Sequence, residues 1–426
     1  MSDLKQTLGI FRGTALMLNI VLGAGLLTLP GLAYRELGEE AVWIWLACGG
    51  AAIPLLVVFA MIGRLYPDAG GIPALAGRIF GHRAYTMSTF LFFGAAALGG
   101  PAIAITGGYY ASAFIDLSPY LLAALLLVAA ALVNLLSAEL AGRIGGVIAS
   151  MLIAVLLVLV VFGFVAVGAS SEDRAIAGPT MQHDMTTYAA VFMMVFFAFT
   201  GWEVAAHLSE EFKRPARDFP LAMALSFVIA IAFYLALAII IAGSDISDHF
   251  EAPFAALFAD HYGDYAGLLV AAVAVLLIFA NLSAAVWAVS RMVLSTARAG
   301  LLPARLAATT NGTPLPSVLV VVITLLTAIA LAAYGLLPLG DLLAYAGQNF
   351  LILYGIAALV LLFAVTDWRI RGAALVAITT VLAVMALRDP LAMLYPGALV
   401  IIGALVPRLR AAPSSRTRVT APPRRR

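Results

Sequence analysis

Charged side chains are scarce in this sequence. Only 11% of the 426 residues are Asp, Glu, Lys or Arg, whereas 64% are hydrophobic, and the mean hydropathy is +1.06. A soluble chain of this length could not bury so much apolar surface, but a bilayer accommodates it directly. Strands of a membrane barrel would alternate over segments of about ten residues, and the apolar runs here do not. The composition therefore predicts an all-α membrane protein.

Cysteine is almost absent as well. Cys48 is the single cysteine, which argues against a disulfide framework or a cysteine metal cluster. The sequence holds five histidines, of which His183, His249 and His261 fall in loops that are expected to be external, and it has no HExxH motif. An intramembrane enzyme would need a nucleophile with its base, or a metal set, within the spans. We therefore expect no enzyme activity, no catalytic residue, no metal and no cofactor.

Apolar runs are what the chain does contain. A spanning helix needs about 20 apolar residues, and twelve such runs are found, the last two being short. They cover residues 9–34, 41–63, 84–114, 119–137, 144–168, 188–209, 219–242, 264–296, 315–334, 340–365, 372–387 and 391–406. The sequence thus predicts twelve transmembrane helices in a single domain, residues 1–406.

The basic residues predict the orientation. With twelve spans both termini share one side of the membrane, and that side carries all but three of the 24 Lys and Arg, the exceptions being Arg35, Arg174 and Arg388. Positive charge favours the cytoplasm, so both termini are expected to be cytoplasmic in a bacterial inner membrane. The Arg-rich tail at 407–426 is interpreted as a disordered positive-inside segment. Nucleic acid or anionic lipid is the alternative partner for it.

Two of the apolar runs contain helix breakers near their middle. The run 9–34 reads "NIVLGAGLLTLP" with Gly23 and Gly25, and the run 188–209 reads "FAFTGWE" with Gly201. Five helices separate the two sites, so the second copy would enter the membrane from the opposite side. This spacing predicts a 5+5 inverted repeat with its first and sixth helices broken. Its halves are about 9–168 and 188–365, followed by two extra helices at 372–406.

Broken helices suit a zwitterionic ligand. Each break exposes N–H groups at one half-helix and carbonyl groups at the other, with dipole ends of opposite sign. Such backbone is tolerable in a bilayer only where it lines a cavity or meets a ligand. A carboxylate can sit on the N–H groups after Gly23, because Ala24 and Gly25 carry little side chain. The alternative is that these glycines serve close helix packing.

Several loop motifs carry a family resemblance. "RLYPDAGG" at 64–71, "EEFKRPARDFPLAM" at 210–223 and "SRMVLSTARAGLLP" at 290–303 resemble loops of the amino acid–polyamine–organocation (APC) transporters, in the family's order. Within that family, "DLKQTLG" and "GWEVAAHLSEEFKRPARDFP" are similar to bacterial exporters of L-methionine and branched-chain amino acids. The resemblance covers roughly residues 5–406 and implies secondary transport by alternating access, with an amino acid as the substrate.

The same resemblance implies where the substrate binds. In the family its carboxylate meets amides of the first break, here Ala24 and Gly25. Its amine meets carbonyls of both breaks, here around Val21, Phe197 and Thr200.

An aromatic side chain near the second break caps the substrate in the family. Phe197, Phe199 and Trp202 are the candidates here, and plain core packing is the alternative for each. Some proton-coupled relatives place a lysine in the fifth helix, where this sequence has Leu152, so that coupling device is absent. Asn281 and Ser283 could help to bind sodium, but interhelical hydrogen bonds are the commoner role of such residues.

Glu203 is the one acid left inside a predicted span once the span ends are excluded. A buried carboxylate costs several kcal/mol unless it is neutralised or paired, which makes it a functional candidate. His207 follows at i+4 on the same helix face. Two interpretations stay open: Glu203 takes up a proton that His207 passes towards the cytoplasm, or Glu203 tethers the loosened backbone to a neighbouring helix.

Further polar residues, Tyr345, Gln348 and Asn349, lie in the tenth run and are expected to face the cavity or the first helix. The stretch "GGPAIAITGG" in the third run leaves room for a substrate side chain, and no second charge is available to pair with a charged one. We therefore expect a transporter of neutral apolar amino acids such as methionine, leucine, isoleucine and valine, working in efflux. An importer or exchanger is the alternative, and a channel or an intramembrane enzyme is a remote one.

Overall fold

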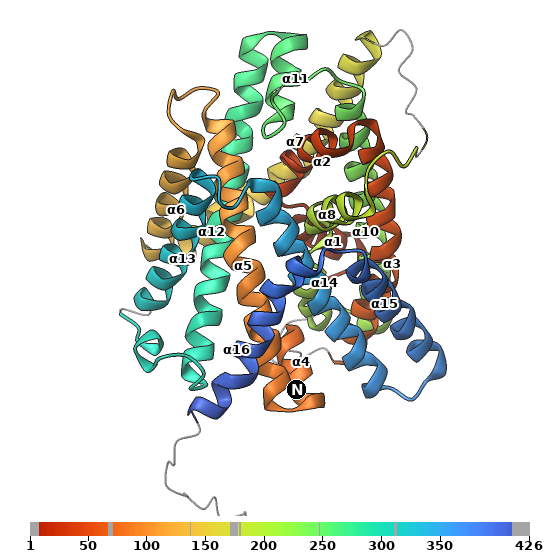
Figure 1. Ribbon diagram of the computed structural model, residues 1–426, viewed down its shortest axis with the longest axis vertical. Coiled ribbons are helices and arrows are strands. Elements are labelled where there is room, and N and C mark those ends of the chain that lie inside the picture. The colour runs from red at the N-terminus through yellow and green to blue at the C-terminus, as the bar shows by residue number, and fades with distance from the viewer. Residues whose placement is uncertain are drawn as a thin grey trace, which may run out of the picture.

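The computed structural model describes residues 8–66, 71–136, 138–170, 178, 180–246, 248–310 and 313–410. The regular secondary structure of the described residues is helical, apart from two isolated bridges. Figure 1 shows most of the long helices running along the long axis of one bundle. The α-helices are α1 (Ile10–Val21), α2 (Leu29–Leu37), α3 (Ala41–Leu65), α4 (Gly71–Phe80), α5 (His82–Ala111), α6 (Pro119–Leu136), α7 (Ala138–Ser170), α8 (Met185–Phe196), α9 (Trp202–Ala205), α10 (Pro215–Ala242), α11 (Pro253–Tyr262), α12 (Asp264–Arg298), α13 (Leu315–Ala333), α14 (Leu339–Ala364), α15 (Trp368–Ala386) and α16 (Leu394–Arg410).

Short 3₁₀ segments interrupt or extend these helices. They are η1 (Ala24–Leu27), η2 (Gly38–Glu40), η3 (Phe197–Phe199), η4 (Ala206–Glu211), η5 (Ala304–Ala307) and η6 (Pro390–Met393).

Ten helical stretches of the described residues are long and apolar enough to cross a membrane. They coincide with ten of the predicted runs, and the first of them joins α2 to α3. The two remaining runs, 9–34 and 119–137, contain the shorter apolar helices α1 and α6. The end of the last run differs slightly from the prediction, because α16 continues through Pro407 to Arg410. The rest of the predicted tail, 411–426, lies outside the described residues.

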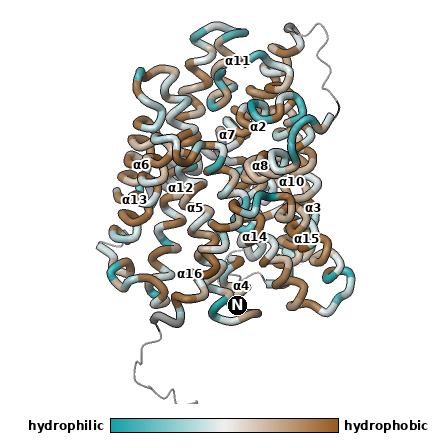
Figure 2. The backbone as a smooth tube through the Cα atoms, in the orientation of Figure 1, coloured by the Kyte–Doolittle hydropathy of each residue, from teal (hydrophilic) through white to brown (hydrophobic). Residues whose placement is uncertain are grey.

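The outer helices expose large apolar side chains. Val165 on α7, Leu269 on α12 and Ile323 on α13 are each more than half exposed. Figure 2 shows apolar residues along the outer helices, with hydrophilic residues more frequent at the upper and lower ends. Apolar surface of this extent marks contact with a membrane, so the chain is a multi-pass membrane protein whose outer helices face lipid.

One structural unit occurs twice. The ten-residue helix α4 is followed by Gly81 and the long helix α5, and the ten-residue helix α11 is followed by Gly263 and the long helix α12. Both glycines have positive φ, +87° and +89°, a conformation that favours glycine. Each short helix folds back against the long helix after it. Figure 1 places α4 near the lower end of the molecule and α11 near the upper end.

Candidate functional site

The first helix is interrupted after Val21. Leu22 still donates to the carbonyl of Leu18 at 2.8 Å, but Gly23 is extended, with φ −94° and ψ 171°, and η1 begins at Ala24. The first N–H groups of a helical segment have no partner within it. Leu26 donates to the Gly23 carbonyl at 3.2 Å. The amides of Gly23, Ala24 and Gly25, which precede it, have no backbone hydrogen-bond acceptor among the described residues. They form the N-terminal end of η1.

The second interruption lies between α8 and α9. Thr200 is extended, with φ −96° and ψ 167°, and its hydroxyl donates to the carbonyl of Phe197 at 2.8 Å. Gly201 has a φ of +106°, which side chains rarely adopt. A Cβ on Gly201 would lie 3.3 Å from the carbonyl oxygen of Ile20 at the end of α1. The two breaks therefore approach each other backbone to backbone.

A small cavity of about 140 Å³ lies where the breaks meet. It is smaller than the roughly 300–1,000 Å³ of pockets for drug-sized ligands, so it suits a ligand of few atoms. We call it the central cavity. Its lining comes from α1, η1, α5, η3, α9, α10 and α12: Ile20, Val21, Gly23, Gly25, Leu26, Ile103, Phe197, Ala198, Thr200, Gly201, Glu203, Tyr234 and Asn281.

Most of the residues predicted at the breaks line this cavity. The structure brings together Val21, Gly23, Gly25, Phe197, Thr200, Gly201 and Glu203. The backbone of Ala24 lies at the start of η1, and its side chain lies outside the described residues.

Two of the three candidate aromatic caps lie elsewhere. Phe199 is buried against Tyr234, with ring centroids 4.9 Å apart, and Trp202 packs on Phe227 at 5.9 Å. Neither Phe199 nor Trp202 lines the central cavity, and their contacts match the core-packing alternative. Phe197 is the candidate whose ring reaches the cavity.

Glu203 is buried and hydrogen-bonded to the second break. Its Oε2 atom accepts from the amide of Gly201 at 3.1 Å and also from the hydroxyl of Tyr354 on α14. The same amide lies 3.1 Å from the Tyr354 oxygen, and the ring of Phe59 packs edge-on against Tyr354 at 4.6 Å. This arrangement joins the loosened backbone to α14. His207 lies in η4, but its side chain is not among those described. The proposed pairing of His207 with Glu203 therefore stays a prediction.

Tyr234 is a site residue that the sequence analysis missed. From α10, its hydroxyl donates to the carbonyl of Ala198 at 2.6 Å and lies 3.3 Å from the carbonyl of Val21. One hydroxyl thus contacts carbonyls of both breaks. The available signal was a tyrosine in the run 219–242, in which Ser226 is the one other polar residue.

Asn281 also reaches the central cavity. Its amide nitrogen lies 3.8 Å from the position that a Cβ on Gly23 would take. Ser283, its partner in the sodium hypothesis, instead accepts hydrogen bonds from Asn134 of α6, at 2.9 Å on the carbonyl and 3.2 Å on the hydroxyl. Ser283 therefore makes the interhelical contact given above as the alternative.

The three polar residues of α14 do not line the central cavity. Gln348 donates to the carbonyl of Ala392 in η6 at 2.9 Å and accepts from Arg388 at 3.3 Å. Tyr345 packs against Tyr395 of α16. Asn349 is fully buried, and its side-chain amide has no hydrogen-bond partner among the described residues. Gln348 and Tyr345 therefore face η6 and α16, and α14 is buried on most sides, so a polar residue on it need not face the central cavity.

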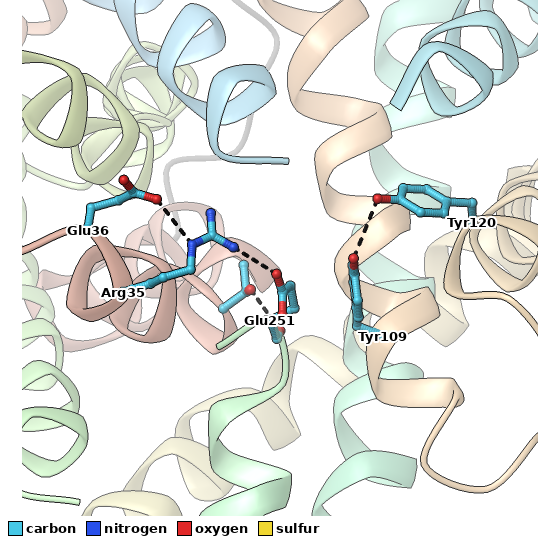
Figure 3. Close-up of polar contacts among 6 residues, drawn as sticks. Arg35, Glu36, Tyr109, Tyr120 and Glu251 are labelled. Carbon is cyan, nitrogen blue, oxygen red and sulfur yellow. Dashed lines mark hydrogen bonds and ion pairs between the residues drawn. The ribbon is translucent and has the colours of Figure 1, made fainter. Parts of the chain in front are cut away.

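A polar cluster joins α2 to the segment that precedes α11 (Figure 3). The guanidinium of Arg35 donates to Glu251 at 2.9 Å and to Glu36 at 3.1 Å. The hydroxyl of Thr28 donates to the backbone carbonyl of Glu251 at 2.8 Å. Gly31 allows close contact as well, since a Cβ there would lie 2.2 Å from the carbonyl oxygen of Phe250.

No group of three or more His, Cys, Asp or Glu side chains that could hold a metal occurs in the described residues. Cys48 is buried, with its Sγ 3.4 Å from the carbonyl of Phe192. The polar groups that face the central cavity are mainly those of the backbone at the two breaks, with the side chains of Thr200, Glu203, Tyr234 and Asn281.

Comparison with known proteins identifies the family. The amino acid permease family matches residues 8–404. The uncharacterized amino acid permease YecA of Bacillus subtilis is 28% identical over 71% of each chain. The L-methionine/branched-chain amino acid exporter YjeH of Escherichia coli is 32% identical over 54% of each chain, and the cadaverine/lysine antiporter of Escherichia coli is 30% identical over 64% of this chain and 62% of its own. The predicted resemblance is confirmed, and the chain belongs to the amino acid permease family of the APC superfamily.

Proposed function

We propose that the protein is a secondary transporter of neutral apolar amino acids that works by alternating access and exports its substrate. One observation carries the proposal: two helix breaks meet at a 140 Å³ cavity lined by backbone polar groups and by a single charged side chain, Glu203. Glu203 is already engaged by Gly201 and Tyr354. A ligand there is held by peptide dipoles, which suits a zwitterion.

The substrate's charged groups have natural positions. Its carboxylate lies on the amides of Gly23, Ala24 and Gly25, at the positive end of η1. Its ammonium lies near the carbonyls of Val21 and Ala198, which Tyr234 orders through its hydroxyl. Ile103 and Phe197 offer apolar contact to the side chain, and no free countercharge is present for a charged one.

The repeated unit supports an inverted repeat. A short helix, a glycine with positive φ and a long helix occur in the same order in both halves, at opposite ends of the molecule (Figure 1). Two copies related by inversion produce this arrangement. With α1–α2 and α8–α9 each counted as one broken span, the helices make twelve spans, with α15 and α16 beyond the repeats. The positive-inside rule then places both termini in the cytoplasm.

The relatives bear on substrate and direction in different ways. YjeH is named as an exporter of L-methionine and branched-chain amino acids, whereas the antiporter is named for cadaverine and lysine. The engaged state of Glu203 leaves no free acid for a cationic side chain in the cavity, which favours the neutral class. An importer or exchanger of the same substrates shares this site, because the ion and substrate gradients set the direction.

Two measurements test the proposal. In a thermal-shift screen of the twenty amino acids on purified protein, methionine, leucine, isoleucine and valine should raise the Tm. In proteoliposomes the same amino acids should show saturable counterflow, measured with and without a proton gradient. Stabilisation by arginine or glutamate alone would overturn the substrate class, and flux without saturation would indicate a channel.

A further inference from the structure

A second, larger cavity adjoins the central one. It has a volume of about 440 Å³ and lies among α5, α12, α13, α14 and α16. Phe197 and Ile103 line both cavities, so the Phe197 ring lies between them. We call this space the side cavity. Gly99 makes room for the ring, since a Cβ there would lie 2.9 Å from it.

The side cavity offers nothing that would hold water. Its described lining includes two polar side chains, Thr324 and Tyr395. The Thr324 hydroxyl donates to the carbonyl of Val320 at 2.8 Å, and the Tyr395 hydroxyl donates to the carbonyl of Gly94 at 2.9 Å. A buried water needs two to four polar partners, so the occupant of this cavity must be apolar.

The cavity reaches the lipid-facing surface between α12 and α13. Ala288, Val320 and Thr324 belong to its lining and are exposed on the outside of the bundle. Ala288 is small and leaves the edge of α12 open. In a membrane, the material in contact with this surface is hydrocarbon, which can enter from the side.

A basic and aromatic stripe continues from Ala288 along the exposed face of α12. Trp287, Arg291 and Arg298 lie on this face at helical spacing. The guanidinium of Arg291 lies over the Trp287 ring, 4.7 Å from its centroid, and donates to the Ser290 hydroxyl at 3.1 Å. Among the residues whose side chains the structure describes, no carboxylate lies within ion-pair distance of Arg291.

Helix geometry gives the depth of Arg291. It follows Asn281, which lines the central cavity, by ten residues, or about 15 Å along α12. Half of the hydrocarbon core of a bilayer is also about 15 Å. With the central cavity at mid-membrane, Arg291 lies at the level of the lipid phosphates, and Arg298 lies further out. A positive charge at that depth, with no carboxylate beside it among the described side chains, suits an anionic headgroup.

We propose that the side cavity and Arg291 together form a binding site for an anionic glycerophospholipid. The phosphate lies on Arg291, with Arg298 as a second positive charge. One acyl chain passes Ala288 between α12 and α13 and fills the side cavity as far as Phe197. The chain end then supports the Phe197 ring from the side opposite to the central cavity. This site is separate from the substrate site and does not depend on which amino acid is carried.

Lipid retention tests the proposal. The protein is purified from membranes and incubated with mixed vesicles or micelles of phosphatidylglycerol and phosphatidylcholine, and bound lipid is counted by native mass spectrometry. Wild-type protein should retain phosphatidylglycerol in preference to phosphatidylcholine. R291Q should weaken this retention about fivefold, since one basic residue near a membrane surface contributes about 1 kcal/mol. R291K should keep most of it.

Two further variants separate the headgroup from the chain. A288L narrows the entry to the side cavity and keeps Arg291, so it should also reduce retention. R369Q is the matched control, because Arg369 also lies over a tryptophan ring, that of Trp368 at 5.5 Å, but belongs to α15, which contributes no residue to the lining of the side cavity. R369Q should retain lipid as wild type does. The Tm of each variant shows that it is folded.

Three results would overturn the proposal. One is equal retention by R291Q and wild type. Another is equal retention of phosphatidylglycerol and phosphatidylcholine. The third is displacement of the bound lipid by inorganic phosphate or by glycerophosphoglycerol, which would indicate a site for free phosphate groups rather than for a lipid with its chain. None of these results bears on whether the protein transports amino acids.

Discussion

The hydrogen bonds of Glu203 fit the tethering interpretation, in which its carboxylate joins the second break to α14. Its carboxylate accepts from Gly201 and Tyr354, and a glutamine can accept the same two hydrogen bonds through its amide oxygen. An alanine leaves both buried donors without that acceptor, at a cost of about 1–3 kcal/mol. We expect E203Q to keep substrate binding and E203A to lose transport and several degrees of Tm. Counterflow rates and thermal unfolding measure the two effects.

The proton role of Glu203 has a separate readout. If Glu203 carries the coupled proton, transport by E203Q loses its pH dependence, because glutamine cannot titrate. Y354F is the control, since it removes a hydrogen bond to the carboxylate but keeps the titratable group. It should lower stability and retain a pH-dependent rate. An unchanged pH profile in E203Q would leave Glu203 with the tethering role alone.

Gly201 tests the close approach of the two breaks. G201A places a Cβ 3.3 Å from the carbonyl of Ile20 at a φ of +106°, with a strain of about 1–3 kcal/mol. G263A is the control, because Gly263 also has positive φ but has no atom within 4 Å of its Cβ position. Both should lower the Tm, and G201A alone should weaken substrate binding, as measured by the ligand-induced shift in Tm. Equal binding in both variants would contradict the role of this contact.

Sequence reasoning located the breaks but not their hydrogen-bond partners. Gly23 and Gly201 could be recognised from the sequence, because glycine permits backbone conformations that other residues avoid. Tyr234 and Tyr354 bind the second break from 36 and 151 residues away, and one sequence holds no signal for such contacts. Phe197 and Phe199 were indistinguishable beforehand, since the direction of each ring depends on the 3₁₀ geometry of η3. The partner of Gln348 was not predictable either, because Ala392 of η6 lies 44 residues further along the chain, and hydropathy does not show which helices pack together.

At the scale of elements, α2 is held by the segment before α11. The Arg35–Glu251 pair is partly exposed, and such pairs contribute about 0.2–1 kcal/mol. Breaking the pair should change the equilibrium constant between α2 packed on this segment and α2 separated from it by up to about fivefold. We expect E251Q to speed amide hydrogen exchange in α2 (Leu29–Leu37) and to raise the rate of transport if opening here limits it.

The neighbouring acid provides the control for that experiment. Glu36 also accepts from Arg35 but lies on α2 itself, so E36Q removes a contact within the helix and leaves the link to Glu251 intact. Exchange in α2 should then stay close to wild type. High salt should narrow the difference between E251Q and wild type, because it screens a partly exposed pair. Equal exchange in E36Q and E251Q would show that the pair does not hold α2.

Long elements were predictable and short ones were not. Apolar runs of about 20 residues have one stable form in a bilayer, so ten runs appear as long helices near their expected bounds. The ten-residue helices α4 and α11 were not predicted, because an apolar stretch of that length is compatible with several kinds of structure. The run 9–34 divides into α1, η1 and α2, as the glycine pair indicated.

At the scale of the whole molecule, the proposed inverted repeat and the distribution of charge lead to one combined prediction of the membrane topology. The positive-inside rule predicts a cytoplasmic position for α4, which carries Arg78, and for Arg83 at the start of α5. The repeat then requires α11, with the acidic residue Asp260, to face the opposite side. Figure 1 is consistent with this pairing, because α4 and α11 lie towards opposite ends of the bundle. The proposed orientation rests on charge and the proposed inversion rests on the repeated unit, so each can be tested separately.

Cysteine labelling from either side of the membrane tests both arguments at once. His82 and Asp264 are equivalent positions, each being the exposed first residue after a glycine with positive φ. The native Cys48 is fully buried and should give little background. In intact cells a membrane-impermeant maleimide should label Asp264→Cys and not His82→Cys, whereas His82→Cys should react after the membrane is opened. Labelling of both from outside would refute the inversion, and the reverse pattern would keep the repeat but invert the orientation, placing the termini outside the cytoplasm.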